Sequence, residues 1–280
     1  NSYIRDTPQL ILPDVTRPVM DLFACETGAL LACAAYLLEE EFNAVSPFVL
    51  TCIEDNLKRR ILLPYLTAHF WWMGHDDEPM CNWTVWCTQN VLLTTFLMPW
   101  SEKMSSKLAA PVRALTGDAP LFLPENTSDT VVTLQAILYK AAESCDYFLK
   151  DYGNDGCCEE GAQYYRHAGL CLYGAMTVLN TVTGGHFSSL FQWDKVKNIA
   201  AYILNVHVDD KYYFNFADCS PIAGRAGVRE YLFGKATGQE DLCLFAAKDF
   251  QAGQGQLITD EVNGGNLFYR MQTVFYYEEL

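Results

Sequence analysis

The feature that most constrains the fold is a series of amphipathic helical segments, each followed by a turn and a returning helix. Apolar residues recur at three- and four-residue spacing over about 18–42, 47–63, 129–151 and 240–252, without a convincing long strand. Antiparallel helix pairs of this kind stack as a solenoid or close into a ring. The pattern predicts an all-α chain with at most one short β hairpin, near residues 210–217.

The size and composition of the chain indicate a well-packed globular protein. The chain has 280 residues, of which 50% are hydrophobic, so a sizeable core is available. The first 17 residues contain prolines and little periodicity, which predicts an extended lead-in. We expect residues 18–280 to form a single helical domain, as part of a longer protein.

The charge of the chain argues against two classes of partner. The formal net charge is −15 and the sequence pI is near 4.6, whereas nucleic acids and anionic membranes require basic patches. We also find no apolar run long enough to span a bilayer and no signal-like segment at the start. A polyanionic substrate would need a local basic cluster, for which the candidates are Arg59, Arg60, Arg166, Arg225 and Arg229.

The cysteines point to free thiols and not to a metal site. The chain has 11 cysteines, an odd number, scattered through helical segments and mostly on apolar faces. None has metal-ligand spacing with a histidine pair, so we expect no metal and no organic cofactor. Buried free thiols are typical of a reducing compartment, which predicts a cytoplasmic protein, or a periplasmic or secreted one if a signal was removed.

One segment, from Tyr152 to Tyr173, combines a turn with acidic and aromatic residues. If a helix begins near Glu159, then Glu160, Gln163, Tyr164 and His167 share one polar face, opposite a small and apolar one. This face is a candidate site. Acidic residues in a first helical turn also serve as caps, an explanation that carries about equal weight.

Two further segments are rich in aromatic residues. Asn82 is placed to cap a helix that runs to about Met98, beside Trp83 and Trp86. Tryptophans near Asn, Asp and His form sugar-binding platforms as well as cores, and we favour a cleft for Trp83 and the core for Trp86. The second segment, HVDDKYYFNFADCSP, predicts a rim strand or hairpin that contains Tyr212 and Tyr213.

The ordered motifs LKRRILLPYL, CNWTVWCTQNVLL, YGNDGCCEEGAQYY, YYFNFADCSP and GKATGQEDL carry a resemblance. Together they resemble the helical domain of the heparinase II/III-like polysaccharide lyases, over about residues 59–249. The resemblance implies an incomplete (α/α) toroid whose open end holds a sugar cleft, usually followed by a β-sandwich domain. It also implies an acidic polysaccharide or oligosaccharide as the partner.

The resemblance implies a mechanism as well. Such lyases remove the proton beside the carboxyl group of a uronic acid and eliminate the linkage oxygen, with a tyrosine for proton transfer. The catalytic residues implied by position are Tyr213, Tyr212, Gln163 and Glu160, with Tyr213 preferred. The implied substrate-binding residues are Asn82, Trp83, Glu159, Tyr164, His167, Arg166 and Asp218.

The motifs depart from the family pattern in ways that keep two alternatives open. Glu159 and Glu160 would repel a uronate unless one carboxyl is protonated. A glycoside or unsaturated-uronyl hydrolase, with Glu160 and either Asp155 or Asp218 as its acid pair, tolerates an acidic cleft better. A non-catalytic carbohydrate-binding or scaffold domain is the other alternative. A lyase predicts an arginine or lysine that faces the cleft together with Tyr213, a hydrolase predicts two carboxylates that face each other across the cleft, and a scaffold predicts a cleft blocked by side chains.

Overall fold

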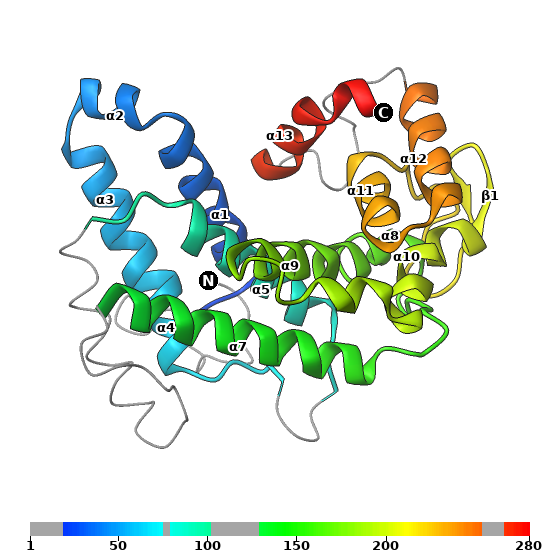
Figure 1. The fold of residues 1–280 in the computed structure, drawn as a ribbon, viewed down its shortest axis with the longest axis horizontal. Helices are drawn as coiled ribbons and strands as arrows, with labels where there is room; N and C mark the ends of the chain where they lie inside the picture. Colours follow the sequence, from blue (N-terminus) through cyan, green and yellow to red (C-terminus); the bar gives the residue numbers. More distant parts are fainter. Residues whose placement is uncertain (1–18, 75–78, 102–128, 254–265) are drawn as a thin grey trace, which may run out of the picture. The chain divides into compact units, whose positions relative to one another are not determined.

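The computed structural model describes residues 19–74, 79–101, 129–253 and 266–280, so the expected lead-in over residues 1–17 lies outside the described residues. The chain divides into two compact units, Asn1–Asp146 and Tyr147–Leu280, each of which is described by itself. Over the described residues both units are helical, and the only sheet has two short strands (Figure 1). The predicted all-α class with one short hairpin is confirmed.

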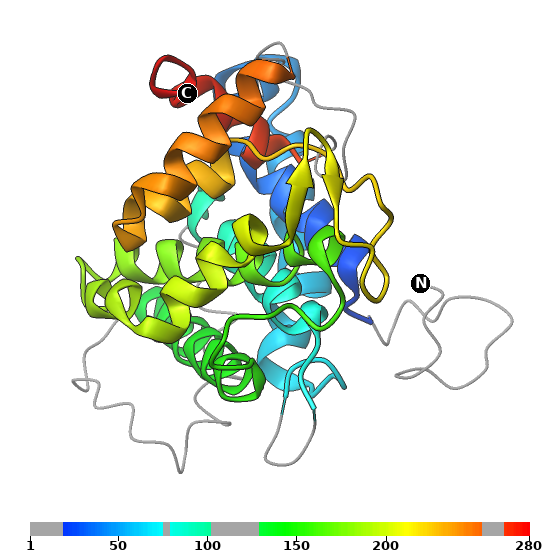
Figure 2. The same ribbon diagram turned by 90° about the vertical axis from the view of Figure 1, so that its right-hand side faces the viewer.

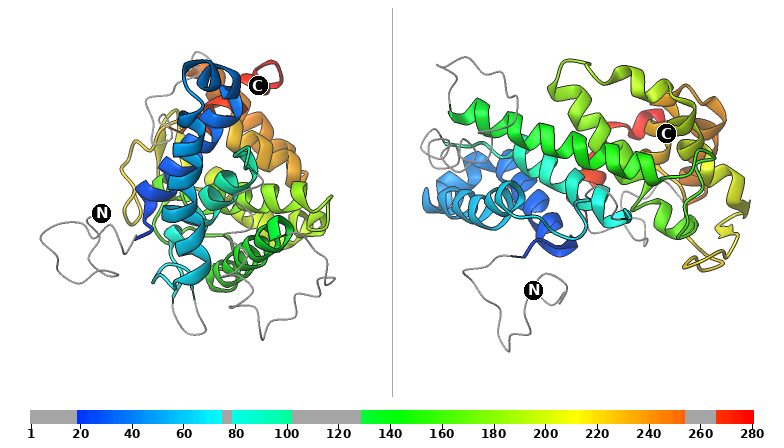
Figure 3. Two further views of the ribbon diagram at one scale, coloured as in Figure 1. Left: turned by 90° about the vertical axis from the view of Figure 1, so that its left-hand side faces the viewer. Right: turned by 90° about the horizontal axis from the view of Figure 1, so that it is seen from below.

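The first unit is built from helices that follow one another closely. In chain order they are α1 (Leu22–Leu37), α2 (Glu39–Val45), α3 (Phe48–Leu57), the π-helical turn η2 (Lys58–Leu62), α4 (Leu63–Thr67), α5 (Asn82–Leu97) and α7 (Asp129–Asp151). α1 packs mainly against α5 and also contacts α3 and η2 (Figure 3). α7 ends with its last residues in the second unit.

The first helix is shorter than the sequence predicts. It begins after Asp21, whose Oδ1 accepts a hydrogen bond from the Ala24 N–H at 2.8 Å, and it ends at Leu37. The chain bends at Leu38, and the three acidic residues that follow form the first turn of α2, where they interact favourably with the helix dipole. The predicted continuous helix over 18–42 is therefore two helices.

The helix after Ser46 continues beyond the point at which we expected Pro64 to stop it. The wide turn η2 joins α3 to α4, and Pro64 lies in the first turn of α4. The backbone stays helical from α3 through η2 into α4, and the local widening at η2 accommodates the proline, which lacks an N–H.

The second unit contains the hairpin and its supporting helices. These elements are α8 (Ala162–Tyr165), α9 (Gly169–Val182), η4 (Ser188–Gln192), α10 (Asp194–Val206), β1 (His207–Asp209), β2 (Tyr212–Tyr213), α11 (Val228–Thr237), α12 (Glu240–Ala252), α13 (Leu267–Phe275) and η5 (Tyr277–Glu279). α11 packs against α9, α10, α12 and α13. The hairpin follows α10 directly (Figure 2).

The apolar face predicted for the segment after Tyr152 is the core of this unit. Its side chains are buried, with relative exposures of 0–3%: Ala162, Tyr165, Leu172, Ala175, Met176 and Leu179. α9 ends at Val182 and is followed by Gly184 and Gly185 with φ of 64° and 91°, which is backbone that glycine adopts without strain. The predicted core face and the predicted glycine stop are both confirmed.

Within the described part of the chain, no single helix has the length and apolar character needed to cross a bilayer. The bent pair α1 and α2, with 85° between its helices, passes this test only when the two are taken together.

Candidate functional site

The polar segment after Tyr152 does not form the single helix that we expected. The chain reaches α8 through Gly161, which has a φ of 89°, and α8 ends at Tyr165, before a turn over 166–168 leads into α9. A Cβ at Gly161 would collide with the Phe216 carbonyl oxygen and lie 2.7 Å from the Cys219 Cβ. The close approach of the rim segment therefore excludes a side chain at Gly161 and delays the helix.

This break changes where the candidate residues lie. Glu159 and Glu160 precede α8, the first exposed and the second half-buried, and His167 lies in the turn after it. The prediction that Glu160, Gln163, Tyr164 and His167 share one continuous helix face is wrong. The structure does keep Tyr164 beside His167, with ring centroids 6.0 Å apart.

The rim segment carries the two tyrosine candidates. β1 and β2 pair antiparallel, with His207 opposite Tyr213 and Asp209 opposite Tyr212. Side chains alternate across a strand, so Tyr213 is buried at 3% exposure while Tyr212 is 45% exposed. The His207 and Tyr213 rings make an edge contact, with centroids 5.0 Å apart.

The same rim segment returns past the polar turn. Gln163 Oε1 accepts a hydrogen bond from the Ser220 N–H at 3.4 Å, and the neighbouring Asp218 is exposed. Gln163 thus connects the start of α8 to the loop after β2, and it lies on the rim with Asp218.

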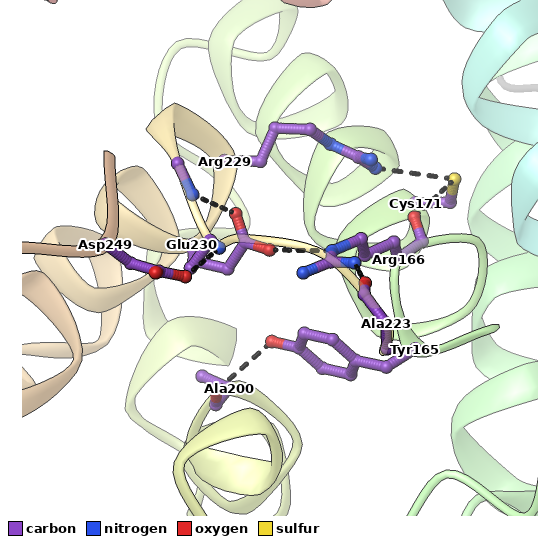
Figure 4. Close-up of polar contacts among 10 residues, drawn as sticks. Tyr165, Arg166, Cys171, Ala200, Ala223, Arg229, Glu230 and Asp249 are labelled. Atoms are coloured by element: carbon purple, nitrogen blue, oxygen red, sulfur yellow. Dashed lines mark hydrogen bonds and ion pairs between the residues drawn. The ribbon is translucent and has the colours of Figure 1, made fainter. Parts of the chain in front are cut away.

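Arg166 links this rim to α11. Its guanidinium is 1% exposed, its Nη1 donates to the Ala223 carbonyl oxygen, and its Nε lies 3.4 Å from Glu230 Oε1 (Figure 4). The guanidinium carbon also lies 6.0 Å from the centroid of the Tyr213 ring. A predicted binding residue and the predicted catalytic tyrosine are therefore neighbours in the second unit.

Glu230 is a central residue that the sequence interpretation missed. It is 4% exposed, and its second oxygen, Oε2, accepts from the Gly227 N–H at 3.0 Å, at the start of α11. One carboxylate thus caps a helix and pairs with Arg166. The available signal was the run of charged residues around Arg225, Arg229 and Glu230 in an otherwise apolar segment.

Arg229, in the first turn of α11, is buried at 5% exposure. Its Nη2 lies 3.6 Å from the Cys171 Sγ, and its guanidinium carbon lies 3.9 Å from the centroid of the Tyr269 ring. Cys171 and Tyr269 were also missed, because neither a buried cysteine nor a tyrosine on an amphipathic helix distinguishes itself from core residues in the sequence.

His167 is buried close to two arginines. Burial, with Arg229 and Arg166 acting in the same direction, lowers the pKa of His167 to about 3. The imidazole is therefore neutral at physiological pH. In this state one ring nitrogen donates a hydrogen bond and the other accepts one.

A second group of charges fixes the hairpin. The Arg225 guanidinium pairs with Asp210, in the turn between β1 and β2, and its Nη1 lies 2.7 Å from Asp249 Oδ1 in α12. Asp249 Oδ2 accepts from the Ala226 N–H at 2.5 Å. These contacts hold the strand that contains Tyr213 against the helices of the second unit.

Asn82 and Trp83 belong to the first unit. Asn82 is the first residue of α5 and is buried, and Cys81 precedes it as the cap residue, so the prediction that Asn82 caps this helix is wrong. Trp83 is half-buried beside Trp71, with ring centroids 5.1 Å apart. Trp86 donates from its indole N–H to Glu26 Oε1 at 2.9 Å.

The alternative acids of a hydrolase make other contacts. Asp155 is exposed and accepts from the Cys157 N–H at 3.0 Å, which is a local turn contact.

Among the residues that the structure describes, no three His, Cys, Asp or Glu side chains are placed to hold a metal ion.

The arrangement in the second unit can hold negative charge. The region around α8 and the start of α11 contains two guanidinium groups, a neutral imidazole, two tyrosine rings and one carboxylate. These belong to Arg166, Arg229, His167, Tyr213, Tyr269 and Glu230. Comparison with known proteins found no matching family model and no matching curated protein.

Proposed function

We propose that the protein is a polysaccharide lyase that cleaves uronate-containing glycans by β-elimination. A base removes the proton from the ring carbon beside the carboxylate, the electron pair forms a carbon–carbon double bond, and the linkage oxygen leaves with a proton. The reaction needs a cation that stabilises the charge developing on the carboxylate and a group that transfers the proton. Tyr213 is the proposed proton-transfer residue, with Tyr212 as the alternative.

The single observation that carries this proposal is the position of Arg166 beside Tyr213, at 6.0 Å from the ring centroid. The guanidinium lies over the face of the Tyr213 ring in a cation–π contact, which places a positive charge beside the candidate phenol. It also attracts an anionic sugar. The sequence-based criterion for a lyase is an arginine or lysine that faces the cleft with Tyr213, and Arg166 would be the cation of that pair if the rim segment opens.

The burial of the same residues favours a second candidate function. Tyr213, Arg166 and His167 have exposures of 3%, 1% and 4%, so a sugar reaches them only if the rim segment moves. If the rim stays closed, the site is inaccessible, and the exposed Tyr212 and the Trp83 region remain for a non-catalytic carbohydrate-binding role.

The experiment incubates the full chain with a panel of uronate-containing glycans and follows the absorbance of the unsaturated uronate product. Tyr213→Phe and Tyr212→Phe remove one phenol oxygen each, and Tyr139→Phe, at a tyrosine 61% exposed in α7, is the matched control. We expect elimination in the wild type and in Tyr139→Phe, and a loss of about 100-fold or more in one rim variant, as is usual for general acid–base groups.

The same samples are assayed for new reducing ends. Reducing ends without the unsaturated product would replace the lyase by a hydrolase. Glycan binding without either product would establish the non-catalytic alternative, and elimination that persists in both rim variants would remove the tyrosines from the mechanism.

A further inference from the structure

Arg229 stands out among the buried charged residues because of what surrounds it. Its contacts in the described residues are the Cys171 sulfur at 3.6 Å and the face of the Tyr269 ring at 3.9 Å. Over the described ranges it forms no ion pair, and its Nη1 has no hydrogen-bond partner although the side chain is 5% exposed. A buried donor left unsatisfied is costly, so this guanidinium edge is suited to an additional acceptor.

The nearest carboxylate is already engaged. Glu230 directs Oε1 to Arg166 at 3.4 Å and Oε2 to the Gly227 N–H at 3.0 Å (Figure 4). Both oxygens therefore point to groups other than Arg229. Burial lowers the pKa of His167, and Arg229 and Arg166 act in the same direction, so both cations act on the neighbouring imidazole.

The packing also makes Arg229 a rigid donor. Stacking on Tyr269 from α13 covers the face of the guanidinium, and the contact with Cys171 from α9 fixes one of its edges. The in-plane N–H groups at Nη1 remain as donors. A planar fork held in this way matches a carboxylate or a phosphate better than a neutral hydroxyl, and the proposed reaction at a uronate favours the carboxylate.

We infer that Arg229 binds the carboxylate of the substrate, so that the buried cluster around α8 and α11 is a hexuronate carboxylate subsite. The inference rests on the proposed lyase function and gives that site its specificity-determining residue. Arg229 then neutralises the carboxylate beside which the proton is removed, while Arg166 stays with Glu230 and Tyr213.

Binding is tested apart from catalysis, with free glucuronate as the probe and the full chain. Calorimetry compares glucuronate with its uncharged methyl ester and with glucose. The variant is Arg229→Lys, which keeps the charge and loses the fork, and Arg59→Lys is the matched control at an exposed arginine that pairs with Asp55. We expect glucuronate to bind the wild type and Arg59→Lys equally, and Arg229→Lys about tenfold more weakly, since charge-assisted pairs are strong.

A second readout uses the wild type alone, in case Arg229→Lys does not fold. A bound carboxylate near Arg229 raises the pKa of His167, because it opposes the cations that lower it. NMR of the His167 ring, assigned with a His167→Asn variant, should move to a higher pKa with glucuronate and stay unchanged with glucose. An unchanged His167 signal with saturating glucuronate overturns the inference.

The remaining outcomes separate the two proposals. Glucuronate binding that depends on Arg229, without elimination of any glycan, keeps the carboxylate subsite and removes the lyase. Elimination with the same kinetics in Arg229→Lys keeps the lyase and removes the subsite. Equal binding of glucose and glucuronate, or no glucuronate binding at millimolar concentration, also overturns the subsite.

Discussion

The two units bury polar groups in different ways. In the first unit, α5 buries neutral side chains that bond to nearby backbone: Thr94 and Thr95 donate to the carbonyl oxygens of Asn90 and Val91 at 2.8 and 2.7 Å. In the second unit several of the buried groups are charged, and Arg166 reaches Glu230 across 64 positions of sequence. Hydroxyl groups such as those of Thr94 and Thr95 are satisfied within their own helix, whereas charges require partners that the fold or a ligand supplies.

Lys140, a half-buried cation of the first unit, contacts backbone carbonyl groups instead of a carboxylate. Lys140 Nζ donates to the carbonyl oxygens of Tyr65 and Ala68 at 2.6 and 3.1 Å, at the end of α4. Burial lowers the pKa of Lys140 to about 8. This lysine caps the end of α4 and thus has a structural role. The candidate site that we describe lies among the buried charges of the second unit.

The largest expected effect comes from removing a buried charge in the second unit. Glu230→Gln leaves Arg166 without its carboxylate and should lower the free energy of unfolding by about 3–5 kcal/mol, as is usual when one partner of a buried ion pair is removed. Thr94→Val, in the first unit, loses one neutral hydrogen bond and should cost about 1 kcal/mol. Urea unfolding measures both, and equal losses would mean that the two units do not differ in this respect.

A smaller effect is the pH dependence of stability that the buried His167 causes. The pKa of His167 is about 3 in the folded state and about 6.5 when unfolded, so between these values the unfolded state binds more protons. Stability should therefore fall as the pH decreases through this window, by up to about 1.4 kcal/mol per pH unit. Unfolding measured from pH 7 to 4 checks the slope.

The control for this prediction is His167→Asn. The raised pKa values of Asp249 and Glu26, both caused mainly by burial, act in the opposite direction, so the wild type and the variant are compared at each pH. Parallel stability curves would contradict the assignment of the acid sensitivity to His167.

The smallest effect tests the tight neutral packing of the first unit. A Cβ at Gly28 in α1 would lie 2.9 Å from the Thr94 Oγ1 and 3.2 Å from the Ile61 Cγ1. Gly28→Ala should therefore cost about 1–3 kcal/mol despite the better helix propensity of alanine. Adding Thr94→Ala removes the nearest atom and should recover part of the loss, as a double-mutant cycle in thermal unfolding would measure.

Thr27→Ala, at an exposed neighbour in the same helix, is the control and should change stability by less than about 0.5 kcal/mol. A Gly28→Ala variant as stable as this control would indicate that α1 and α5 adjust without strain.

Local sequence pattern was sufficient for most helices. Residues 129–151 and 240–252 form helices with the predicted bounds, because long amphipathic repeats with clear stops leave few alternatives. The hairpin was predictable for the same reason, from the alternation around Tyr212 and Tyr213. The break at Leu38 and the passage through Pro64 were not, since each depends on a turn geometry that periodicity does not specify.

The candidate site was predictable only in part. Arg166 and His167 were singled out from residue type and position and Tyr213 from the family resemblance, and the structure places Arg166 close to both Tyr213 and His167 in the second unit. Glu230, Cys171 and Tyr269 were missed, because their roles come from contacts with residues far away in the sequence. Whether the helical hairpins of the two units close into the expected toroid stays a prediction.

The sequence by itself determined the helical class, the buried face of α9 and the types of residue available for chemistry, since these follow from periodicity, turn residues and composition. Tertiary structure decided that α8 stops at Tyr165, that Tyr213 is buried and Tyr212 exposed, and that Arg229 faces a sulfur and a ring. The physical reason is the sequence separation over which each effect acts. Helix propensity acts over a few residues, whereas the free energy of a buried charge depends on whichever groups the whole fold places within a few ångströms.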